Sequence, residues 1–379
     1  MFSGLLIAFA ALLGIPLFAF FVFLVYIIVR YEPVVSRIFD KPPMLLPLRE
    51  PAEPDGESAR FQAKDGIELT GTYWKAKTPR RAGVLLFCHE YLGDRQSASS
   101  YAGFLRDLGF DLFAFDFRNH GDSGVEKKYR PRQWVTDRET TDLSAALEYL
   151  RRRSDADPSG LALFGVSRGG SAALCLAADP TVWGVITDGA FPTKGTMLAY
   201  IIRWADIYVG QKIWYPYLPV WIFRFLGWMS LFMTGRRWGC RFPDVEKAAK
   251  QLSPRPWLMI HGEKDAYIGL DIARNLFNLA GDPKELWIVP EAKHNRCREM
   301  EPEEYRSRVG TFLRESLARK RGLSVESSPR VLASETPTVE AISASAASAP
   351  VLAKTPELSG IASVDVSSGA IAEGVALGG

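Results

Sequence analysis

Six short apolar runs recur between residues 83 and 289, and each is typical of a strand that is buried on both faces. Segments with the periodicity of amphipathic helices, such as residues 142–153 and 268–279, lie between these runs. Regular alternation of this kind predicts an α/β fold class, in which helices cover both faces of a mostly parallel sheet. The expected strands occupy residues 83–88, 111–117, 161–166, 182–187, 257–260 and 286–289.

Two further strands are expected before these runs, at residues 60–64 and 67–75, where apolar and polar residues alternate. Asp65 and Gly66 join them, and Asp-Gly between two alternating segments is a strong signal for a tight hairpin turn. The hairpin would add antiparallel strands at one edge of the sheet. The whole pattern therefore predicts a sheet of the eight-stranded type.

The amino-terminal segment, residues 2–29, contains no charged side chain. As a helix, these 28 residues would span about 42 Å, enough to cross a hydrocarbon core of about 30 Å with some tilt. Pro16 would kink the helix, which membrane helices tolerate. A cleaved signal peptide is the alternative, but it normally has a basic start, a shorter apolar core and a small-residue cleavage site. This segment has none of these, so the pattern predicts a transmembrane anchor over residues 1–30.

Basic residues follow the predicted anchor, and the positive-inside rule then favours a cytoplasmic location for the rest of a single-pass chain. These residues are Arg30, Arg37, Lys41 and Arg49. Residues 31–58 include a stretch rich in proline and charge and are interpreted as a linker. Deletion of residues 1–41 is accordingly expected to leave a folded, active remainder.

Aromatic residues crowd the segment between two of the predicted strands, residues 192–246. We interpret this segment as a helical cap over one edge of the sheet, with an aromatic core of its own. Because Trp, Tyr and Arg favour membrane interfaces, the cap is also a candidate for contact with the bilayer. A second membrane span at residues 218–235 is disfavoured, because Arg224 interrupts it and its length is marginal.

Composition excludes several classes of function. The formal net charge is +3, which implies no general attraction to nucleic acid. The four cysteines show no C-x-x-C spacing and the four histidines include no pair at helical ligand spacing, so no metal or other cofactor is expected. Residues 322–379 are rich in Ser, Ala, Thr and Pro and contain no aromatic residue, which predicts a disordered tail.

Residues 165–169 read Gly-Val-Ser-Arg-Gly and overlap the end of the apolar run 161–166. Small residues at 170–178 then favour a closely packed helix. A G-x-S-x-G pattern between a strand and a helix is typical of a nucleophile elbow, where only Gly on either side permits so tight a turn. The alternative is a serine in an ordinary helix-capping turn. Ser167 is therefore the candidate nucleophile.

A serine hydroxyl needs a base to remove its proton, and the base needs an acid to fix its tautomer. When the serine lies at an elbow, the acid and the base are expected at later strand ends, in the order Ser, Asp, His. Asp265 follows the strand at 257–260 and His294 follows the strand at 286–289, so both appear in that order.

Other residues compete for these roles. Asp188, at the end of the strand at 182–187, is the alternative acid. His89, His120 and His261 each lie beside a turn at a strand end, and we interpret them as residues that brace the loops.

With these motifs, the region from residue 60 to residue 321 resembles the α/β-hydrolases. The resemblance implies a core in two parts, residues 59–191 and 247–321, with the cap inserted between them. The chain is most similar to the serine-aminopeptidase-like and dienelactone-hydrolase-like branches, which carry an F-D-x-R-G-x-G-x-S stretch that holds loops behind the active site. Here residues 115–123 read Phe-Asp-Phe-Arg-Asn-His-Gly-Asp-Ser, with Asn119 in place of the usual Gly.

The resemblance also implies an oxyanion hole made of two backbone N–H groups. One belongs to Arg168, directly after the nucleophile, and the other to Tyr91, in the loop after the strand at 83–88. Glu90 replaces the Gly that is usual before the second donor. A carboxylate near a developing oxyanion is unfavourable, so Glu90 is expected to point away or to be paired.

The sequence as a whole predicts a membrane-anchored serine hydrolase that forms an acyl-enzyme on Ser167. The expected substrate is a small-molecule carboxylic ester or thioester, with an acyl or lipid-like group suited to an aromatic cap. A peptidase or amidase of the same fold is one alternative. A non-catalytic membrane scaffold is another, and Glu90 argues weakly for it.

Overall fold

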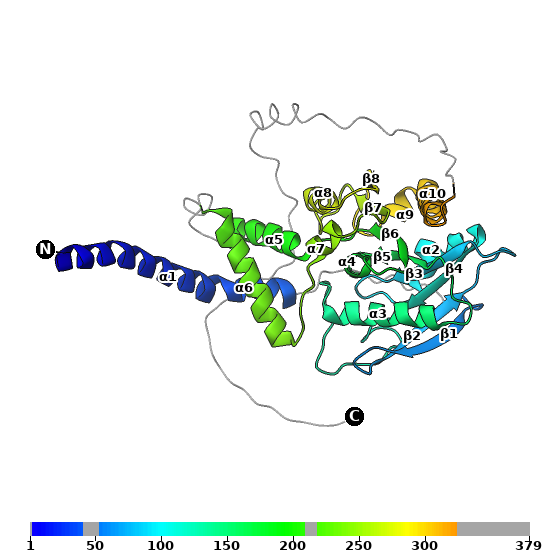
Figure 1. Ribbon diagram of the computed structural model, residues 1–379, viewed down its shortest axis with the longest axis horizontal. Coiled ribbons are helices and arrows are strands. Elements are labelled where there is room, and N and C mark those ends of the chain that lie inside the picture. Colours follow the sequence, from blue (N-terminus) through cyan, green and yellow to red (C-terminus); the bar gives the residue numbers. More distant parts are fainter. Residues whose placement is uncertain (1, 41–52, 209–217, 324–379) are drawn as a thin grey trace, which may run out of the picture. The chain divides into compact units, whose positions relative to one another are not determined.

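The computed structural model describes residues 2–40, 53–208 and 218–323, and these residues form one sheet of eight strands with helices on both faces (Figure 1). The strand order is β1-β2-β4-β3-β5-β6-β7-β8. The predicted fold class is confirmed, and every strand expected from the sequence is present. The strands are β1 (Glu57–Gln62), β2 (Glu68–Trp74), β3 (Gly83–Cys88), β4 (Phe110–Phe115), β5 (Leu161–Val166), β6 (Val182–Asp188), β7 (Trp257–Gly262) and β8 (Lys284–Val289).

The pairing of the strands sets where loops with chemistry can meet. Strands β3 to β8 are mutually parallel, so their carboxyl ends lie along one edge of the sheet. Strands β1 and β2 form the predicted hairpin, and β2 pairs antiparallel with β4. Gly66 makes the hairpin turn with a φ of +86°, and its N–H donates to the carbonyl of Ala63 at 2.9 Å.

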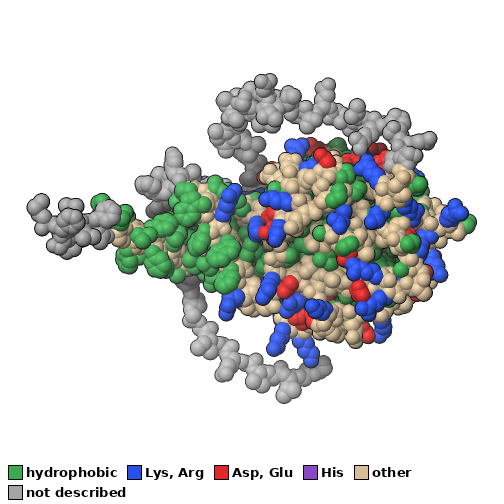
Figure 2. Space-filling view, viewed as in Figure 1, with side chains coloured by type: hydrophobic (Ala, Val, Ile, Leu, Met, Phe, Trp, Pro, Cys, Tyr) green, Lys and Arg blue, Asp and Glu red, His purple; other side chains and the backbone are tan. Residues whose placement is uncertain are grey.

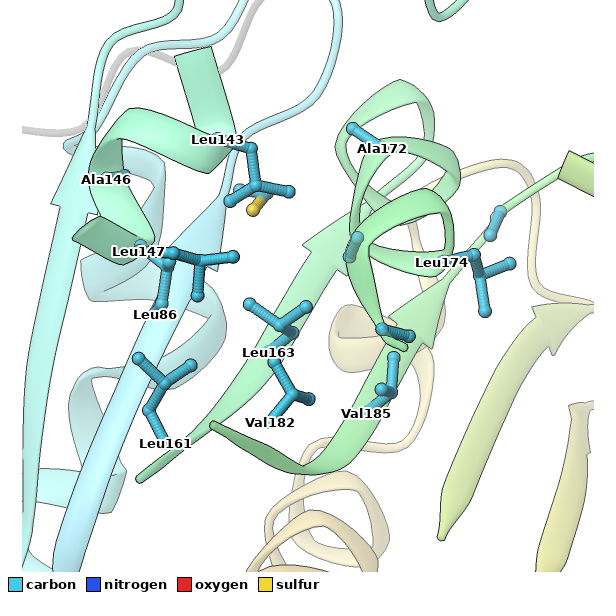
Figure 3. Packing of buried hydrophobic residues seen from close by; sticks show 14 of the residues in the cluster. Leu86, Leu143, Ala146, Leu147, Leu161, Leu163, Ala172, Leu174, Val182 and Val185 are labelled. Atoms are coloured by element: carbon cyan, nitrogen blue, oxygen red, sulfur yellow. The ribbon is translucent and has the colours of Figure 1, made fainter. Parts of the chain in front are cut away.

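Two apolar clusters, one on each face of the sheet, form the core. Leu143 and Leu147 point toward the sheet residues Leu86 and Leu163 in one of them (Figure 3). The helices of this face are α3 (Asp137–Arg152), α4 (Arg168–Leu176), α7 (Val245–Lys250) and α8 (Leu270–Leu279). Those of the other face are α2 (Ser97–Ala102), η1 (Gly103–Leu108), α9 (Cys297–Met300) and α10 (Pro302–Lys320). Burial of central strands on both sides explains their continuous apolar runs.

Helix α3 begins five residues before the start expected from its apolar periodicity, at Asp137 rather than residue 142. Thr136 and Glu139 form a capping box, in which the Glu139 carboxylate accepts the N–H of Thr136 at 2.8 Å. The Thr-x-x-Glu spacing marks the start of this helix. The apolar periodicity begins only in the second turn and therefore does not indicate it.

The amino-terminal helix α1 (Phe2–Asp40) continues ten residues beyond the boundary predicted for the anchor. Residues 31–40 were expected to be linker and are helical. Ile27, Val35 and Phe39 are buried in a third apolar cluster, which also contains residues from the cap. Packing against cap residues therefore stabilises the last ten residues of α1 as a helix, because these distant residues cover an apolar face of α1 that would otherwise be exposed.

The end of the predicted linker is also part of the folded region. Glu53 and Asp55 both form ion pairs with Arg106 of η1, a guanidinium that is itself buried. Strand β1 starts at Glu57, within the segment assigned to the linker. Residues 41–52, and the predicted tail from residue 324 onward, lie outside the described residues.

The outer part of α1 has a different environment from its buried end. Large apolar side chains such as Leu12, Phe18 and Phe21 are exposed there, and Figure 2 shows hydrophobic side chains gathered over this part of the molecule. Among the described helices, α1 alone is long and apolar enough to cross a membrane, with a candidate span at Leu12–Arg37.

The cap lies between β6 and β7, as predicted, and its described helices are α5 (Thr193–Tyr208) and α6 (Val220–Trp238). The cap core includes Met197 and Ile201 of α5 and Ile222 of α6, packed with the buried end of α1. The first two residues of helix α7 were assigned to the cap. The helix packs instead in the first core cluster, where it contacts α4. Residues 209–217 of the cap lie outside the described residues.

Candidate active site

Ser167 occupies a sharp turn between β5 and α4, with φ of +51° and ψ of −117°. This conformation is strained for a residue with a side chain. The glycines on either side permit it: a Cβ on Gly165 would lie 2.4 Å from the Gly169 carbonyl oxygen, and one on Gly169 would lie 2.2 Å from that of Cys88. The local geometry is that of the elbow expected from the sequence, and not that of an ordinary capping turn.

His294 and Asp265 reach Ser167 from the loops that follow β8 and β7. The Oγ of Ser167 is 2.9 Å from Nε2 of His294, and Nδ1 of His294 is 2.6 Å from Oδ2 of Asp265. The other carboxylate oxygen of Asp265 accepts the backbone N–H groups of Tyr267 and Ile268, each at 2.9 Å. The structure thus brings the predicted nucleophile, base and acid into one hydrogen-bonded chain.

Charge fixes the direction of these hydrogen bonds. Burial of Asp265 would raise its pKa, but the hydrogen bond and charge of His294, with the nearby His261 and the backbone donor, outweigh burial and hold that pKa below its ordinary value. Asp265 is therefore ionised at neutral pH and accepts a hydrogen bond from the Nδ1–H group of His294. Nε2 is then left as the acceptor for the Ser167 hydroxyl.

Asp188, the alternative acid, has different partners. Its carboxylate accepts the Tyr305 hydroxyl at 3.1 Å, and its main-chain carbonyl accepts the N–H of Ser167 at 2.7 Å. Burial raises the pKa of Asp188 to about 6. Among the described residues, Asp265 and not Asp188 is the carboxylate hydrogen-bonded to His294.

The two residues expected to supply the oxyanion hole are held together by their side chains. The Arg168 guanidinium is fully buried, lies 5.4 Å from the centre of the Tyr91 ring, and pairs with Glu139 at 3.5 Å. It also donates to the carbonyl of Arg132 at 3.0 Å. These contacts of the buried guanidinium hold the first residue of α4 in place. The first backbone N–H groups of a helix have no partner within the helix, so the N–H of Arg168 is available to an oxyanion.

The three remaining histidines have the loop-bracing contacts expected of them. His89 accepts the N–H of Phe117 at Nε2 and donates from Nδ1 to the Glu90 carbonyl. His120 accepts from Arg168 and donates to the Arg118 carbonyl, and burial with the charge of Arg168 lowers its pKa to about 3.

His261 belongs to the same group of loop-bracing residues. Its Nε2 donates to the carbonyl of Ile268 at 2.9 Å. Burial lowers its pKa, so the ring is neutral and is not a second base.

The stretch at residues 115–123 also has a structural role. Arg118 is fully buried and binds the carboxylates of Asp65, Glu126 and Asp142, so it ties the hairpin turn to α3. Asn119 has a φ of +60°, in the left-handed region that usually favours Gly but that Asn tolerates. The departure from the family pattern at this position is therefore conformationally conservative.

Glu90 is buried, and its carboxylate folds back over Gly93 and accepts the Ser97 hydroxyl at 3.2 Å. It is thus paired, as expected, but only in part, because its Oε2 has no hydrogen-bond partner among the described residues. Burial raises the pKa of Glu90 to about 7. At or below neutral pH a large share of this side chain is uncharged, which removes much of the electrostatic objection to a glutamate at this position.

Because the pKa of Glu90 rises from 4.5 to about 7 on folding, we expect the folded state to lose stability as the pH rises through this interval. In the unfolded chain Glu90 loses its proton near pH 4.5, whereas in the folded protein it keeps the proton up to about pH 7. The full loss of stability is therefore reached only above about pH 7. Glu90→Gln removes the ionisable group and with it this loss. The substitution should therefore raise the free energy of unfolding more at pH 8 than at pH 5, by up to roughly 3 kcal/mol. Thermal unfolding in detergent at the two pH values measures this difference, with the exposed Glu303→Gln as control. A Glu90→Gln variant that shows the same pH response as wild type would contradict it.

Comparison with known proteins agrees with this geometry. A model of the alpha/beta hydrolase family matches residues 85–308, more than half of the chain. The chain belongs to the alpha/beta hydrolase family. The solved structure of the Pyrococcus furiosus esterase Pf2001 matches this hydrolase with a TM-score of 0.52 at 20% identity, over 73% of this chain and 97% of that one. At this identity the likeness shows the fold alone.

Curated relatives cover most of the hydrolase region. The uncharacterized protein YfhR of Escherichia coli O157:H7 is 26% identical over 268 residues, which are 69% of this chain and 81% of YfhR. The uncharacterized protein YqkD of Bacillus subtilis is 25% identical over 234 residues, which are 61% of this chain and 70% of YqkD. These relatives support the family and leave the substrate open.

The sequence did not reveal the supporting residues of the site. Tyr267 and Ile268 hold Asp265 through backbone N–H groups, which have no signature in side-chain type. Glu139 pairs with the buried Arg168, and the sequence signal for it was the capping box of α3. That box predicts a helix start, and only the fold shows that the same carboxylate faces the nucleophile helix.

Proposed function

We propose that this hydrolase is a membrane-anchored serine esterase that cleaves a carboxylic ester or thioester. The observation that carries the proposal is the hydrogen-bonded chain from Ser167 through His294 to Asp265 at the carboxyl ends of β5, β8 and β7. A serine at a strained elbow, a base within 2.9 Å of it and an ionised orienting carboxylate are the parts that acyl transfer needs.

In the proposed reaction, His294 takes the proton of Ser167 as Oγ attacks the carbonyl carbon of the ester. The resulting oxyanion accepts hydrogen bonds from the N–H groups of Tyr91 and Arg168. His294 then gives its proton to the leaving alcohol or thiol, which leaves an acyl-enzyme on Ser167. Water attacks this ester while His294 removes the proton of the water, and return of that proton to Oγ releases the acid. Asp265 remains ionised throughout and stabilises the imidazolium.

An apolar acyl or lipid-like group is the proposed feature of the substrate. The cap above the site buries apolar side chains, and its helix α6 exposes several more, including Trp221, Trp228 and Phe232. Such a surface suits a substrate that partitions into membranes. A peptidase or amidase uses the same catalytic groups, so turnover on matched substrates has to separate the two activities.

Turnover of an ester panel by the detergent-solubilised protein tests the proposal. The panel contains acyl esters and thioesters of graded chain length, with aminoacyl amides for comparison, and labelling by a fluorophosphonate probe is measured in parallel. Ester turnover with labelling supports an esterase. Faster turnover of the amides than of the esters would favour a peptidase or amidase. Absence of both turnover and labelling would favour a non-catalytic membrane scaffold.

The proposed single-pass anchor is α1, with the hydrolase region on the cytoplasmic side. Its candidate span is exposed over the outer part, as a lipid-facing helix would be. Cleavage as a signal peptide after the apolar run would remove Ile27 from the third apolar cluster, which argues for a retained helix. Arg30 and Arg37 at the inner end support the cytoplasmic side.

The buried end of α1 changes what truncation should do. Deletion of residues 1–41 removes Ile27, Val35 and Phe39 from the third apolar cluster. The lost apolar burial should lower the free energy of unfolding by roughly 5 kcal/mol. We expect this variant to unfold roughly 10 °C lower than wild type and to aggregate. Deletion of residues 1–24 keeps all three side chains and serves as the matched control. It should stay folded, turn over esters and no longer sediment with membranes.

Thermal unfolding and ester turnover of the two truncated proteins, side by side in detergent, provide the measurement. Equal stability and activity of both variants would mean that the buried end of α1 is dispensable. Persistent membrane sedimentation of the shorter deletion would mean that α1 is not the principal anchor.

A further inference from the structure

Helix α6 of the cap runs beside α1, and the two helices point in the same direction. The ring centre of Trp221, at the start of α6, lies 5.8 Å from that of Phe20. At the other end of α6, the ring centre of Trp238 lies 6.0 Å from that of Phe39. At a rise of about 1.5 Å per residue, these contacts are separated by about 29 Å along α1 and about 26 Å along α6. The start of α6 is therefore level with Phe20, well inside the apolar part of α1.

The exposed side of α6 is rich in large aromatic residues. Trp221, Trp228 and Phe232 are each about half exposed, and the rings of Trp228 and Phe232 stack with their centres 6.0 Å apart. Together with Arg224 they recur at intervals of three or four residues, so they share one face of the helix. Figure 2 shows hydrophobic side chains gathered over α6 and the outer part of α1. The apolar surface of the proposed anchor thus continues onto the cap.

Basic side chains border this aromatic face. Between residues 195 and 241 the sequence has six basic residues and one acidic residue, Asp206. The guanidinium of Arg236, at the end of α6, lies 5.8 Å from the ring centre of Phe232. Aromatic rings beside arginines are the composition of a helix that lies in a membrane interface. The excess of positive charge favours a surface of anionic headgroups.

Arg224 limits how deep this face can lie. Its side chain is exposed and follows Trp221 by one turn of α6. A guanidinium is strongly disfavoured at the centre of a bilayer, and a long basic side chain near the interface extends to the headgroups. Trp221, and with it the ring of Phe20, therefore belongs near the surface of the hydrocarbon core and not at its midplane.

The length of α1 agrees with this depth. Residues 2–20 contain no charged side chain, and their 19 residues span about 29 Å of helix, close to the roughly 30 Å of a hydrocarbon core. Beyond them α1 contains Glu32, which is buried in the protein and accepts the hydroxyl of Ser36. The second half of α1 is thus built to pack against the cap. The candidate span Leu12–Arg37 would place this half in lipid instead.

We propose that the exposed face of α6, formed by Trp221, Arg224, Trp228 and Phe232, docks on an anionic bilayer surface, and that residues 2–20 of α1 cross the bilayer beside it. This inference rests on the proposed anchor and specifies where the membrane surface meets the protein. The docking adds to the anchor and does not replace it, because a few interfacial side chains bind a membrane only reversibly.

Photo-crosslinking from α6 tests the docking surface. The full-length protein carries benzoylphenylalanine in place of Trp228 or Phe232, in nanodiscs of phosphatidylcholine and phosphatidylglycerol in equal parts. Benzoylphenylalanine in place of Met300, which is exposed on α9, is the matched control. We expect lipid adducts from both α6 positions at about ten times the control yield or more. Discs of phosphatidylcholine alone should lower the yield about fivefold, the effect of one basic residue near an anionic surface.

Two results would overturn the docking surface. One is a lipid-adduct yield from the α6 positions that is no higher than that from position 300. The other is crosslinking of these positions to a second copy of the chain in place of lipid, which would make the face a protein interface.

Thiol accessibility along α1 tests the boundary of the membrane. Ile15→Cys and Val29→Cys both replace exposed side chains, and both proteins are treated in the same nanodiscs with a membrane-impermeant maleimide. Val29 lies about 14 Å beyond Phe20, so its thiol should react about ten times faster than that of Ile15→Cys or more. Wild-type protein, in which three of the four cysteines are buried, gives the background. Equally slow reaction of both thiols would overturn the boundary at residue 20.

The outcomes also separate this inference from the anchor on which it rests. If alkaline carbonate extracts the full-length protein from membranes, or if both thiols react fast in nanodiscs, the proposed anchor fails and the docking fails with it. If the chain resists extraction and α6 gives no lipid adducts, the anchor stands and the docking surface alone is wrong.

Discussion

Ser167→Ala is expected to lower ester turnover by on the order of 10⁴ or more and to abolish fluorophosphonate labelling. The hydroxyl that lies 2.9 Å from Nε2 of His294 is the proposed nucleophile, and without it no acyl-enzyme forms. His294→Ala should have an effect of the same size, because members of a triad act as a unit. Rates on the ester panel and gel detection of the fluorescent probe measure both variants.

Ser171→Ala is the matched control for this experiment. Ser171 is also buried, on the same helix one turn away. Its hydroxyl bonds the main chain of Phe191 and, at 3.4 Å, the carbonyl of Ser167, and among the described residues it has no hydrogen bond to His294. This variant should lose some thermal stability and keep its labelling. Labelling retained in Ser167→Ala, or lost in Ser171→Ala with the fold intact, would mean that the nucleophile has been misassigned.

Much of the fold was predictable because burial leaves a direct mark on a sequence. Residues 83–88 and 161–166 are apolar throughout, since their strands lie in the middle of a sheet covered on both faces, and their predicted bounds match β3 and β5. The hairpin was equally clear, because Asp65-Gly66 has the turn chemistry that the backbone requires.

The order of the candidate site residues was also predictable, since parallel strands bring their carboxyl ends to one edge. Ser167, Asp265 and His294 each follow such a strand, so their proximity follows from topology before any side chain is placed. What the sequence could not decide was which carboxylate faces the base. Asp188 and Asp265 both end strands, and only the packing around Tyr305 and Ile268 distinguishes them.

The predictions were least accurate where distant residues determine local structure. Residues 31–40 were assigned to the linker because the uncharged run ends at residue 29, yet the helix continues through them. The stabilising contacts come from the cap and from Trp134, whose ring lies 5.4 Å from that of Phe39. A single-sequence pattern contains no information on that pairing, so the helix was judged on its length for a membrane and not on its tertiary partners.

The second large effect concerns the acid. Asp265→Asn should lower ester turnover by on the order of 10⁴ while it leaves the fold intact. The amide oxygen can still accept the N–H groups of Tyr267 and Ile268, so the loop keeps its hydrogen bonds. The amide nitrogen, however, presents a donor to Nδ1 of His294 and thereby favours the tautomer with the proton on Nε2. A protonated Nε2 cannot accept the proton of the serine hydroxyl.

Asp188→Asn provides the comparison that makes the result decisive. Asp188 is fully buried and accepts the Tyr305 hydroxyl, and it has no hydrogen bond to His294 among the described residues, so its replacement should cost less than about tenfold in turnover. Both variants are measured on the same ester across pH, with circular dichroism to confirm that each is folded. A mild Asp265→Asn together with a crippled but folded Asp188→Asn would reverse the assignment. It would place the working acid at the end of β6, and the hydrogen bond of Asp265 to His294 would then be structural.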